Sequence, residues 1–202
     1  MNLTMRKIVF TAGSVLLLLV AAGCNDSNKQ ESPVRLFVSN TQTLHTLDLA
    51  GDPAGSNKCQ QSIGSITMQT EVVEPTTTNT TISTGEFAAL NTVTIDRYQV
   101  SYQRTDGGRL VPASFVRGTG VVIAPNAQSQ PTTFVIFDPN AFASAPFASL
   151  LPVNGGVDPE TGRPAITMDV IVTFFGTTAA GERVSGSTRL SLSFCFQCGG
   201  CS

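Results

Sequence analysis

Tryptophan is absent from this 202-residue sequence, histidine occurs once, and only 13% of the residues are charged. Soluble proteins carry on average about twice that share of charged residues. Helix surfaces are usually rich in lysine and glutamate, so the shortage disfavours a helical protein. Serine and threonine are plentiful instead, which is typical of strands whose exposed faces carry hydroxyl groups. The composition therefore predicts an all-β fold.

Positive charge is also scarce. The chain has 12 basic and 14 acidic residues, and two of the basic ones, Arg6 and Lys7, lie in an N-terminal segment that we expect to be removed. The mature chain would then keep ten basic residues and a formal charge of −4, without a basic cluster. Binding to nucleic acid or to anionic lipid by charge is therefore not expected.

The first 24 residues have the pattern of an export signal. Arg6 and Lys7 precede an apolar run, 8–22, which is too short for a membrane span of about 20 residues but fits a signal peptide. The run closes with Ala21-Ala22-Gly23-Cys24. These residues resemble the lipobox of bacterial lipoproteins, although Ala21 stands where leucine is usual. The resemblance implies cleavage before Cys24, a diacylglycerol on its sulfur and a further acyl chain, such as palmitate, on its amine.

The lipobox also implies a place in the cell. Residues 1–23 would be a helical signal peptide, 24–33 a flexible lipidated tether, and 34–202 a single domain. Several acyl chains hold a protein stably on a membrane, so the domain would be membrane-anchored and extracytoplasmic, in the periplasm or elsewhere in the cell envelope. In enteric bacteria an aspartate after the cysteine signals inner-membrane retention. Here Asn25 follows Cys24, so in a Gram-negative cell the resemblance favours the outer membrane.

The mature chain contains several short segments with strand character. The apolar parity switches near Asp96-Arg97, which predicts a β-bulge. Residues 141–151 are the only segment with the sequence character of a helix, and Pro146 interrupts it. Residues 74–84 are rich in threonine and are expected to form a loop. Tyr98 and Tyr102 share a strand face and are expected to pack. The strands predicted in this part are Val34–Val38, Leu44–Leu49, Ile66–Val72, Val93–Gln103, Phe115–Ala124 and Thr132–Phe137.

The last two predicted strands form a hairpin. Ile166–Phe174 places its even-numbered apolar residues on one face, and Arg189–Phe196 alternates in the same way, with a turn expected at 176–181. About seven short strands around one core resemble an immunoglobulin-like fold, a single antiparallel β-sandwich. The Cys-Trp-Cys core signature of that fold is absent. A small barrel is the alternative.

Cysteine is the most distinctive residue of the mature chain. If Cys24 carries lipid, four cysteines remain, and an oxidising compartment favours disulfides among them. They are Cys59, Cys195, Cys198 and Cys201. Strand parity places Cys195 on the face of Ser191 and Ser193, away from the core. Cys59 is its natural partner, and such a bond would stabilise the fold by about 2–4 kcal/mol.

The alternative is that Cys59, Cys195, Cys198 and Cys201 bind zinc or copper as thiolates, or act as redox-active thiols. Covalent c-type haem needs Cys-x-x-Cys-His, and no histidine follows either pair. The disulfide interpretation predicts no cofactor.

Catalytic groups are few. A Ser-His-Asp triad would have to use His45, the single histidine, and no Gly-x-Ser-x-Gly elbow is present. The carboxylates Asp138 and Asp169 do not have the spacing of a catalytic carboxylate pair. Residues 158–162, which contain Asp158 and Glu160, are expected to form a turn. We therefore expect a non-catalytic binding or structural module of the envelope, whose partner is another envelope protein or a surface polymer. The alternative is a metal- or redox-active lipoprotein.

Overall fold

The computed structural model describes residues 33–41, 46–50, 63–72, 89–138 and 140–198. The chain divides into two units, 1–31 and 32–202, and every described residue belongs to the second. The predicted signal segment and Cys24 lie outside the described residues, as do His45, Cys59, Cys201 and the loop 74–84. The helices within the described part are too short or too polar to cross a bilayer.

Most of the described residues are in strands, which confirms the all-β prediction. The strands are β1 (Val34–Asn40), β2 (Thr46–Asp48), β3 (Ile63–Val72), β4 (Val93–Arg104), β5 (Phe115–Ile123), β6 (Thr132–Val135), β7 (Ala165–Thr178) and β8 (Arg183–Cys195). Three short 3₁₀-helices lie between β6 and β7: η1 (Ala141–Ala143), η2 (Phe147–Leu150) and η3 (Pro152–Asn154). Each predicted strand coincides with an observed one, with ends displaced by a few residues.

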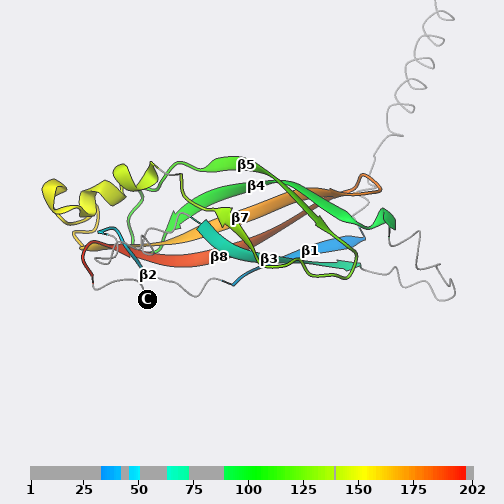
Figure 1. The fold of residues 1–202 in the computed structure, drawn as a ribbon. Helices are drawn as coiled ribbons and strands as arrows, with labels where there is room; N and C mark the ends of the chain where they lie inside the picture. The colour runs from blue at the N-terminus through cyan, green and yellow to red at the C-terminus, as the bar shows by residue number, and fades with distance from the viewer. Residues whose placement is uncertain (1–32, 42–45, 51–62, 73–88, 139, 199–202) are drawn as a thin grey trace, which may run out of the picture. The chain divides into compact units, whose positions relative to one another are not determined.

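The strands form two sheets (Figure 1). One has the order β1-β3-β6, and the other, which is curled, has the order β2-β8-β7-β4-β5. Adjacent strands run antiparallel except at β2 and β8, which pair in parallel over three residues. The expectation of a wholly antiparallel arrangement is therefore wrong at this edge. The immunoglobulin-like arrangement stays a prediction.

Alternation along β7 and β8 builds the core between the sheets. The even-numbered residues of β7 from Ile166 to Phe174 are fully buried, and in β8 Leu190, Leu192 and Phe194 face the same interior. Phe196, which the alternation also placed inward, is half-buried against this core. The predicted buried and hydroxyl-rich faces of the hairpin are thus present.

The predicted bulge in β4 is confirmed by a register shift between Ile95 and Arg97, in the pairings with both β5 and β7. Opposite it, Gly176 pairs with Ile95, and a Cβ on Gly176 would collide with the carbonyl oxygen of Thr94. Gly176 is therefore a strand residue, and the turn expected at 176–181 is shorter. It lies at 179–181, where Gly181 has φ +89°.

The two sheets approach closely where β1 lies against β8. A Cβ on Gly186 of β8 would be 2.5 Å from the carbonyl oxygen of Leu36 in β1, so only glycine permits this distance. Farther along the same contact, Nδ2 of Asn40 donates a hydrogen bond to the carbonyl oxygen of Arg189 at 2.7 Å. β8 therefore has β2 and β7 as hydrogen-bonded neighbours and β1 across the sheet junction.

Residues 141–151, the segment predicted to have helical character, close one end of the core. η1 and η2 are separated at Pro146, which follows a cis peptide bond, as the predicted interruption requires. The rings of Phe137, Phe142, Phe147 and Phe194 cluster beneath them, with centroids 4.5 Å apart for Phe147 and Phe194.

Tyr98 and Tyr102 belong to the core as predicted, and their hydroxyls donate to the carbonyl oxygens of Val135 and Ile136. Burial raises the pKa of both hydroxyls.

Candidate functional site

The C-terminal cysteine run contains a disulfide between Cys195, the last residue of β8, and Cys198. The pairing of Cys195 with Cys59 that we expected is therefore wrong. The physical reason is local: the chain turns directly after β8, with Gln197 at φ 53°, and this turn brings Cys198 back to Cys195. A four-residue loop restricts the unfolded chain far less than a loop back to Cys59 would, with chain-entropy terms of about 2 and about 5 kcal/mol.

The carboxylate of Asp48 holds this turn to the N-terminal part of the domain. Asp48 of β2 is the register partner of Cys195 and is only 3% exposed. Its Oδ1 accepts hydrogen bonds from the backbone N–H of Ala50 and Gln197, at 3.0 and 2.9 Å, and its Oδ2 accepts one from Cys198 at 3.0 Å. Hydrogen bonds to an ionised acceptor are the stronger kind. Asp48 thus connects the two segments as the predicted disulfide would have done.

Bonded sulfurs are not metal ligands, so a four-thiolate site would require the Cys195–Cys198 disulfide to be reduced. Elsewhere in the described ranges, no three His, Cys, Asp or Glu side chains are grouped so as to hold a metal ion. Cys195 is 7% exposed and Cys198 lies at the surface. Cys198 is therefore the more exposed residue of the pair.

A buried ion-pair cluster lies around Arg104, the last residue of β4. Its Nε and Nη2 donate to the two carboxylate oxygens of Asp106 at 2.7 and 2.8 Å, and Nη2 also donates to Oδ2 of Asp158 at 2.8 Å. The side chains of Arg104, Asp106 and Asp158 are at most 2% exposed. Nη1 donates to the carbonyl oxygen of Leu110 at 3.3 Å. The cluster joins the β4–β5 connection to the turn 158–162.

Backbone donors complete the cluster. Asp106 accepts hydrogen bonds from the N–H groups of Gly108 and Thr167, and Asp158 accepts two from Thr161. Burial alone would raise the pKa of Asp106, but the hydrogen bonds from Arg104 and the backbone lower it to about 2. For Asp158 the bonds from Arg104 and Thr161 likewise outweigh burial and lower the pKa. Both carboxylates are therefore ionised. Asp106 bonds to Arg104 through both of its oxygens. Asp158 does so through Oδ2 alone, while its Oδ1 is buried and has no hydrogen-bond partner among the described residues.

Of the other carboxylates noted in the sequence, Asp169 and Asp138 pair with other arginines, and Glu160 lies at the rim of the cluster, 3.8 Å from Nη1 of Arg104. Asp169 accepts hydrogen bonds from Arg189 at 3.0 Å and from Ser191 at 2.6 Å, and Asp138 is 3.9 Å from Arg117. Glu160 caps the loop by accepting the backbone N–H groups of Leu110 and Arg109, which lower its pKa.

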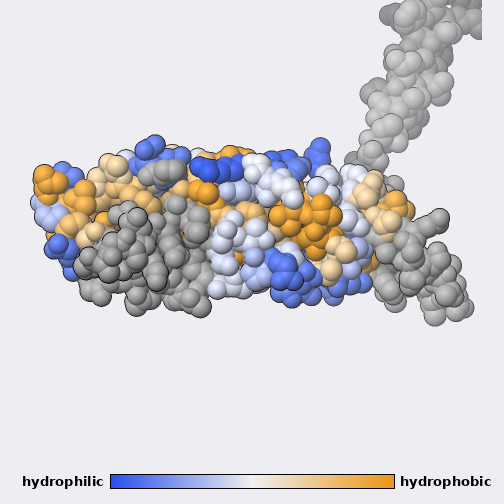
Figure 2. All heavy atoms as spheres, viewed as in Figure 1, coloured by the Kyte–Doolittle hydropathy of each residue, from blue (hydrophilic) through white to orange (hydrophobic). Residues whose placement is uncertain are grey.

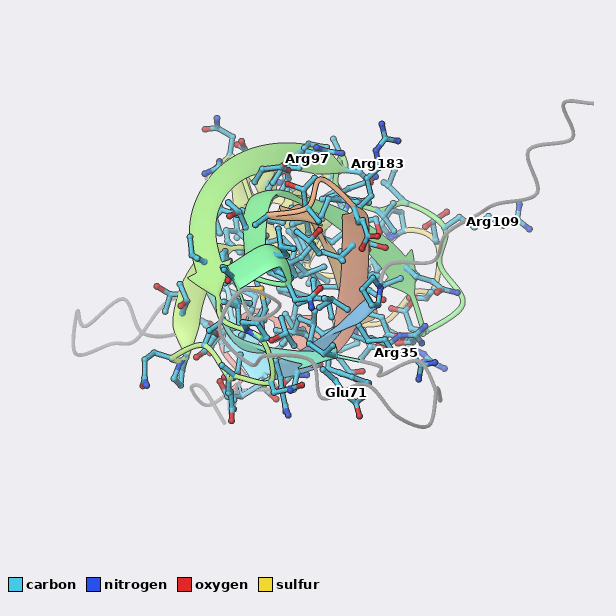
Figure 3. The ribbon with its side chains drawn as sticks, turned by 90° about the vertical axis from the view of Figure 1, so that its right-hand side faces the viewer. Arg35, Glu71, Arg97, Arg109 and Arg183 are labelled. Atoms are coloured by element: carbon cyan, nitrogen blue, oxygen red, sulfur yellow. A yellow bond between two sulfur atoms is a disulfide. The ribbon has the colours of Figure 1, made fainter. Side chains whose placement is uncertain are left out.

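Shallow hollows occur on the surface of the described part. One, of about 350 Å³, lies beside the β4 bulge and is lined by residues that include Arg97, Phe175 and Arg183. Arg97 is stacked over Phe175 and bonded to Asp96. Figure 3 shows Arg97 and Arg183 at the same edge of the domain.

Another hollow, of about 310 Å³, surrounds Phe37, which is 48% exposed among Gln69, Glu71 and Asn126. An exposed ring beside polar groups is a surface that a sugar polymer can contact. Apolar and polar residues are interspersed over the face seen in Figure 2.

The open edge of the five-stranded sheet is the most unusual surface of the described chain. β5 is the last strand in the order and pairs with β4 alone, so among the described residues its outer edge has no neighbouring strand (Figure 1). Its even-numbered residues are exposed, and Val116 and Val122 are 58% and 64% exposed. Gly118 and Gly120 lie between them on the same face.

Proteins usually protect such an edge with lysine, proline, inward charges or a bulge. β5 contains neither lysine nor proline over nine residues. Its protection is limited to the register shift in its pairing with β4 and to one charged residue, Arg117, which lies opposite the buried Tyr98. Arg117 has its guanidinium over the ring of Phe115, 5.2 Å from the centroid. An exposed edge of this kind is a template for adding another strand.

No protein-family model, no curated protein and no solved structure matches the chain. The geometry of the described residues and the N-terminal sequence pattern therefore carry the functional argument.

Proposed function

We propose that this chain is a membrane-anchored, extracytoplasmic lipoprotein whose domain is a non-catalytic binding module of the cell envelope, with a protein partner. The lipobox pattern ending at Cys24 supports the anchor. The domain in this proposal is an immunoglobulin-like β-sandwich, which the two packed sheets support. The observation that carries the binding role is the open edge of β5.

Binding at this edge would take place by strand addition. An extended segment of the partner would form main-chain hydrogen bonds with β5, and apolar side chains of that segment would contact Val116 and Val122. β5 is already ordered by its pairing with β4, so binding would not require it to fold first. A protein with an extended, apolar segment fits this edge better than a charged polymer, because the outward face of β5 carries only valine and glycine.

Photocross-linking in cells tests this binding role. A photoreactive amino acid is placed at Val116 or Val122 of the full chain, and at Val153 as the control. Val153 is 85% exposed on η3, far from β5 in the sequence. We expect a defined protein adduct from both β5 positions and none from Val153. Equal or absent adducts at all three positions would contradict strand addition at β5.

A second experiment tests the anchor. The lipobox pattern predicts that the mature chain begins at an acylated Cys24, with a mass raised by the lipid. A Cys24→Ala variant should remain uncleaved at this site and should not incorporate labelled palmitate. A wild-type chain cleaved elsewhere and free of lipid would refute the lipoprotein assignment.

A redox-active lipoprotein is the second candidate, and the exposed position of Cys198 favours it. An external thiolate could attack Cys198 and release Cys195 as a thiolate. The buried carboxylate of Asp48 disfavours that step, because a second negative charge would form beside it. The reduction potential of the Cys195–Cys198 disulfide distinguishes the two candidate functions. Structural disulfides have reduction potentials below about −300 mV, and exchange-active disulfides have higher ones. A potential near that of glutathione, about −240 mV, would move the redox role to first place.

A further inference from the structure

We propose that the strand added to β5 is β5 of a second copy of this chain, antiparallel, with a two-fold axis at Thr119. This inference rests on the proposed use of the β5 edge. The observation behind it is a symmetry in the exposed face of the strand. Val116, Gly118, Gly120 and Val122 are its exposed residues, and the order valine, glycine, glycine, valine is the same read in either direction.

A two-fold axis at Thr119 uses this symmetry. Val116 of each copy lies opposite Val122 of the other, and Gly118 lies opposite Gly120. An interface of this type is self-complementary, because each copy contributes the same patch. Side chains that lie directly opposite each other in a pair of antiparallel strands contact one another, and the symmetry produces two such pairs of valines.

Neighbouring registers lose this match. An axis at Gly118 places Val116 opposite Gly120 and leaves Val122 opposite Ser114, beyond the end of the strand. An axis at Gly120 places Val122 opposite Gly118. An axis at Arg117 brings the two guanidinium groups directly opposite each other, and like charges in that position are destabilising. The Thr119 axis alone, among these four, pairs both valines.

Charge is also compatible with the Thr119 axis. Arg117 of one copy would lie opposite Val121 of the other, and the two Arg117 residues would be four positions apart along the strands. At about 3.4 Å per residue this is about 14 Å, longer than the Debye length of about 8 Å at physiological ionic strength. The guanidinium of Arg117 is also occupied within its own copy, over Phe115 and 3.9 Å from Asp138.

The connection after β5 fixes the length of the edge. The carbonyl oxygens of Ala124 and Ala127 accept hydrogen bonds from Thr70 of β3, at 2.6 Å from its hydroxyl and 3.0 Å from its N–H. The chain therefore turns toward the other sheet directly after Ile123. The span 116–122 that the two-fold pairing needs lies entirely before this turn.

Pairwise cross-linking of the full chain in its membrane tests the register. Two single variants, Val116→Cys and Val122→Cys, are oxidised mildly, alone and mixed, with the wild-type chain as background for the native cysteines. We expect a cross-link between the two introduced thiols in the mixture and no comparable homodimeric cross-link in either variant alone. Equal cross-linking of each variant alone would overturn the register, and hence the inference.

A second measurement separates this inference from the proposed function. Val122→Lys should raise the dissociation constant of the dimer at least tenfold, because it removes both valine pairs, whereas Val153→Lys should leave it unchanged. A chain that stays monomeric at membrane densities, while photocross-links from Val116 and Val122 still capture a different protein, would overturn the two-fold pairing and leave strand addition standing. A monomer without specific photocross-links would overturn both.

Discussion

Replacing Arg104 by methionine tests whether the buried cluster is structural. The variant keeps an unbranched side chain of similar length but leaves Asp106 and Asp158 buried without their cation, and Leu110 without its donor. Removing one partner of a buried ion pair costs about 3–5 kcal/mol. Because the cluster lies at the end of β4, close to solvent, we expect a loss near the lower value, about 3 kcal/mol. Urea unfolding at pH 7 measures it.

The pH dependence of this loss has a definite sign. In the wild type the pKa of Asp106 is about 2, below its ordinary 3.8, so its stabilisation is complete above about pH 4 and is lost as the pH falls through 2. Without Arg104, burial, the largest cause acting on this carboxyl, is opposed only by the backbone N–H groups of Gly108 and Thr167, so we expect the pKa of Asp106 to rise above its ordinary value. The variant therefore takes up a proton between pH 7 and 4 and recovers stability, so the difference from wild type shrinks.

Arg97→Met is the matched control. Arg97 forms an exposed ion pair with Asp96, with the two side chains 54% and 49% exposed, and such pairs contribute about 0–1 kcal/mol. If Arg104→Met costs no more than this control at pH 7, or costs the same at pH 7 and pH 4, the reasoning about the cluster is wrong.

Two further predictions concern the junctions of β8. Asp48→Asn keeps the shape of the side chain but removes its charge and one of its two acceptor oxygens, so the unfolding free energy should fall by about 1–3 kcal/mol; an unchanged urea midpoint would contradict the role of Asp48. Gly186→Ala should destabilise the domain by about 1–3 kcal/mol, because the added methyl group must displace β1. Gly120→Ala is its control, since a Cβ there meets nothing within 4 Å, and equal melting temperatures for the two variants would refute the close approach.

Alternation predicted most of the strands because burial of one sheet face leaves a period of two in the sequence. The β4 bulge was predictable for the same reason, since a change of parity at Asp96-Arg97 requires an extra residue. Arg104 was not identified, although it lies on the same parity as Tyr98 and Tyr102 and is followed by Asp106. A charged residue on the core parity was the available signal.

The cysteine pairing could not be predicted from sequence, because it depends on where the chain turns after β8. The position of Asp48 could not be predicted either, since the parallel pairing of β2 with β8 joins segments about 148 residues apart. The open edge of β5 depends on the order of strands in the sheet, and alternation within single segments carries no information about that order.

The pairing of β2 with β8 determines when this domain can fold. β2 pairs with β8. The hydrogen bonds from Asn40 to Arg189, and from the turn after β8 to Asp48, span 149 and 150 residues. A chain entering a compartment from its N-terminus cannot close the curled sheet until β8 has emerged, and contacts this distant in sequence slow folding. In the export that we propose, this topology would keep the chain extended until β8 has crossed the membrane, and the domain would become compact only afterwards.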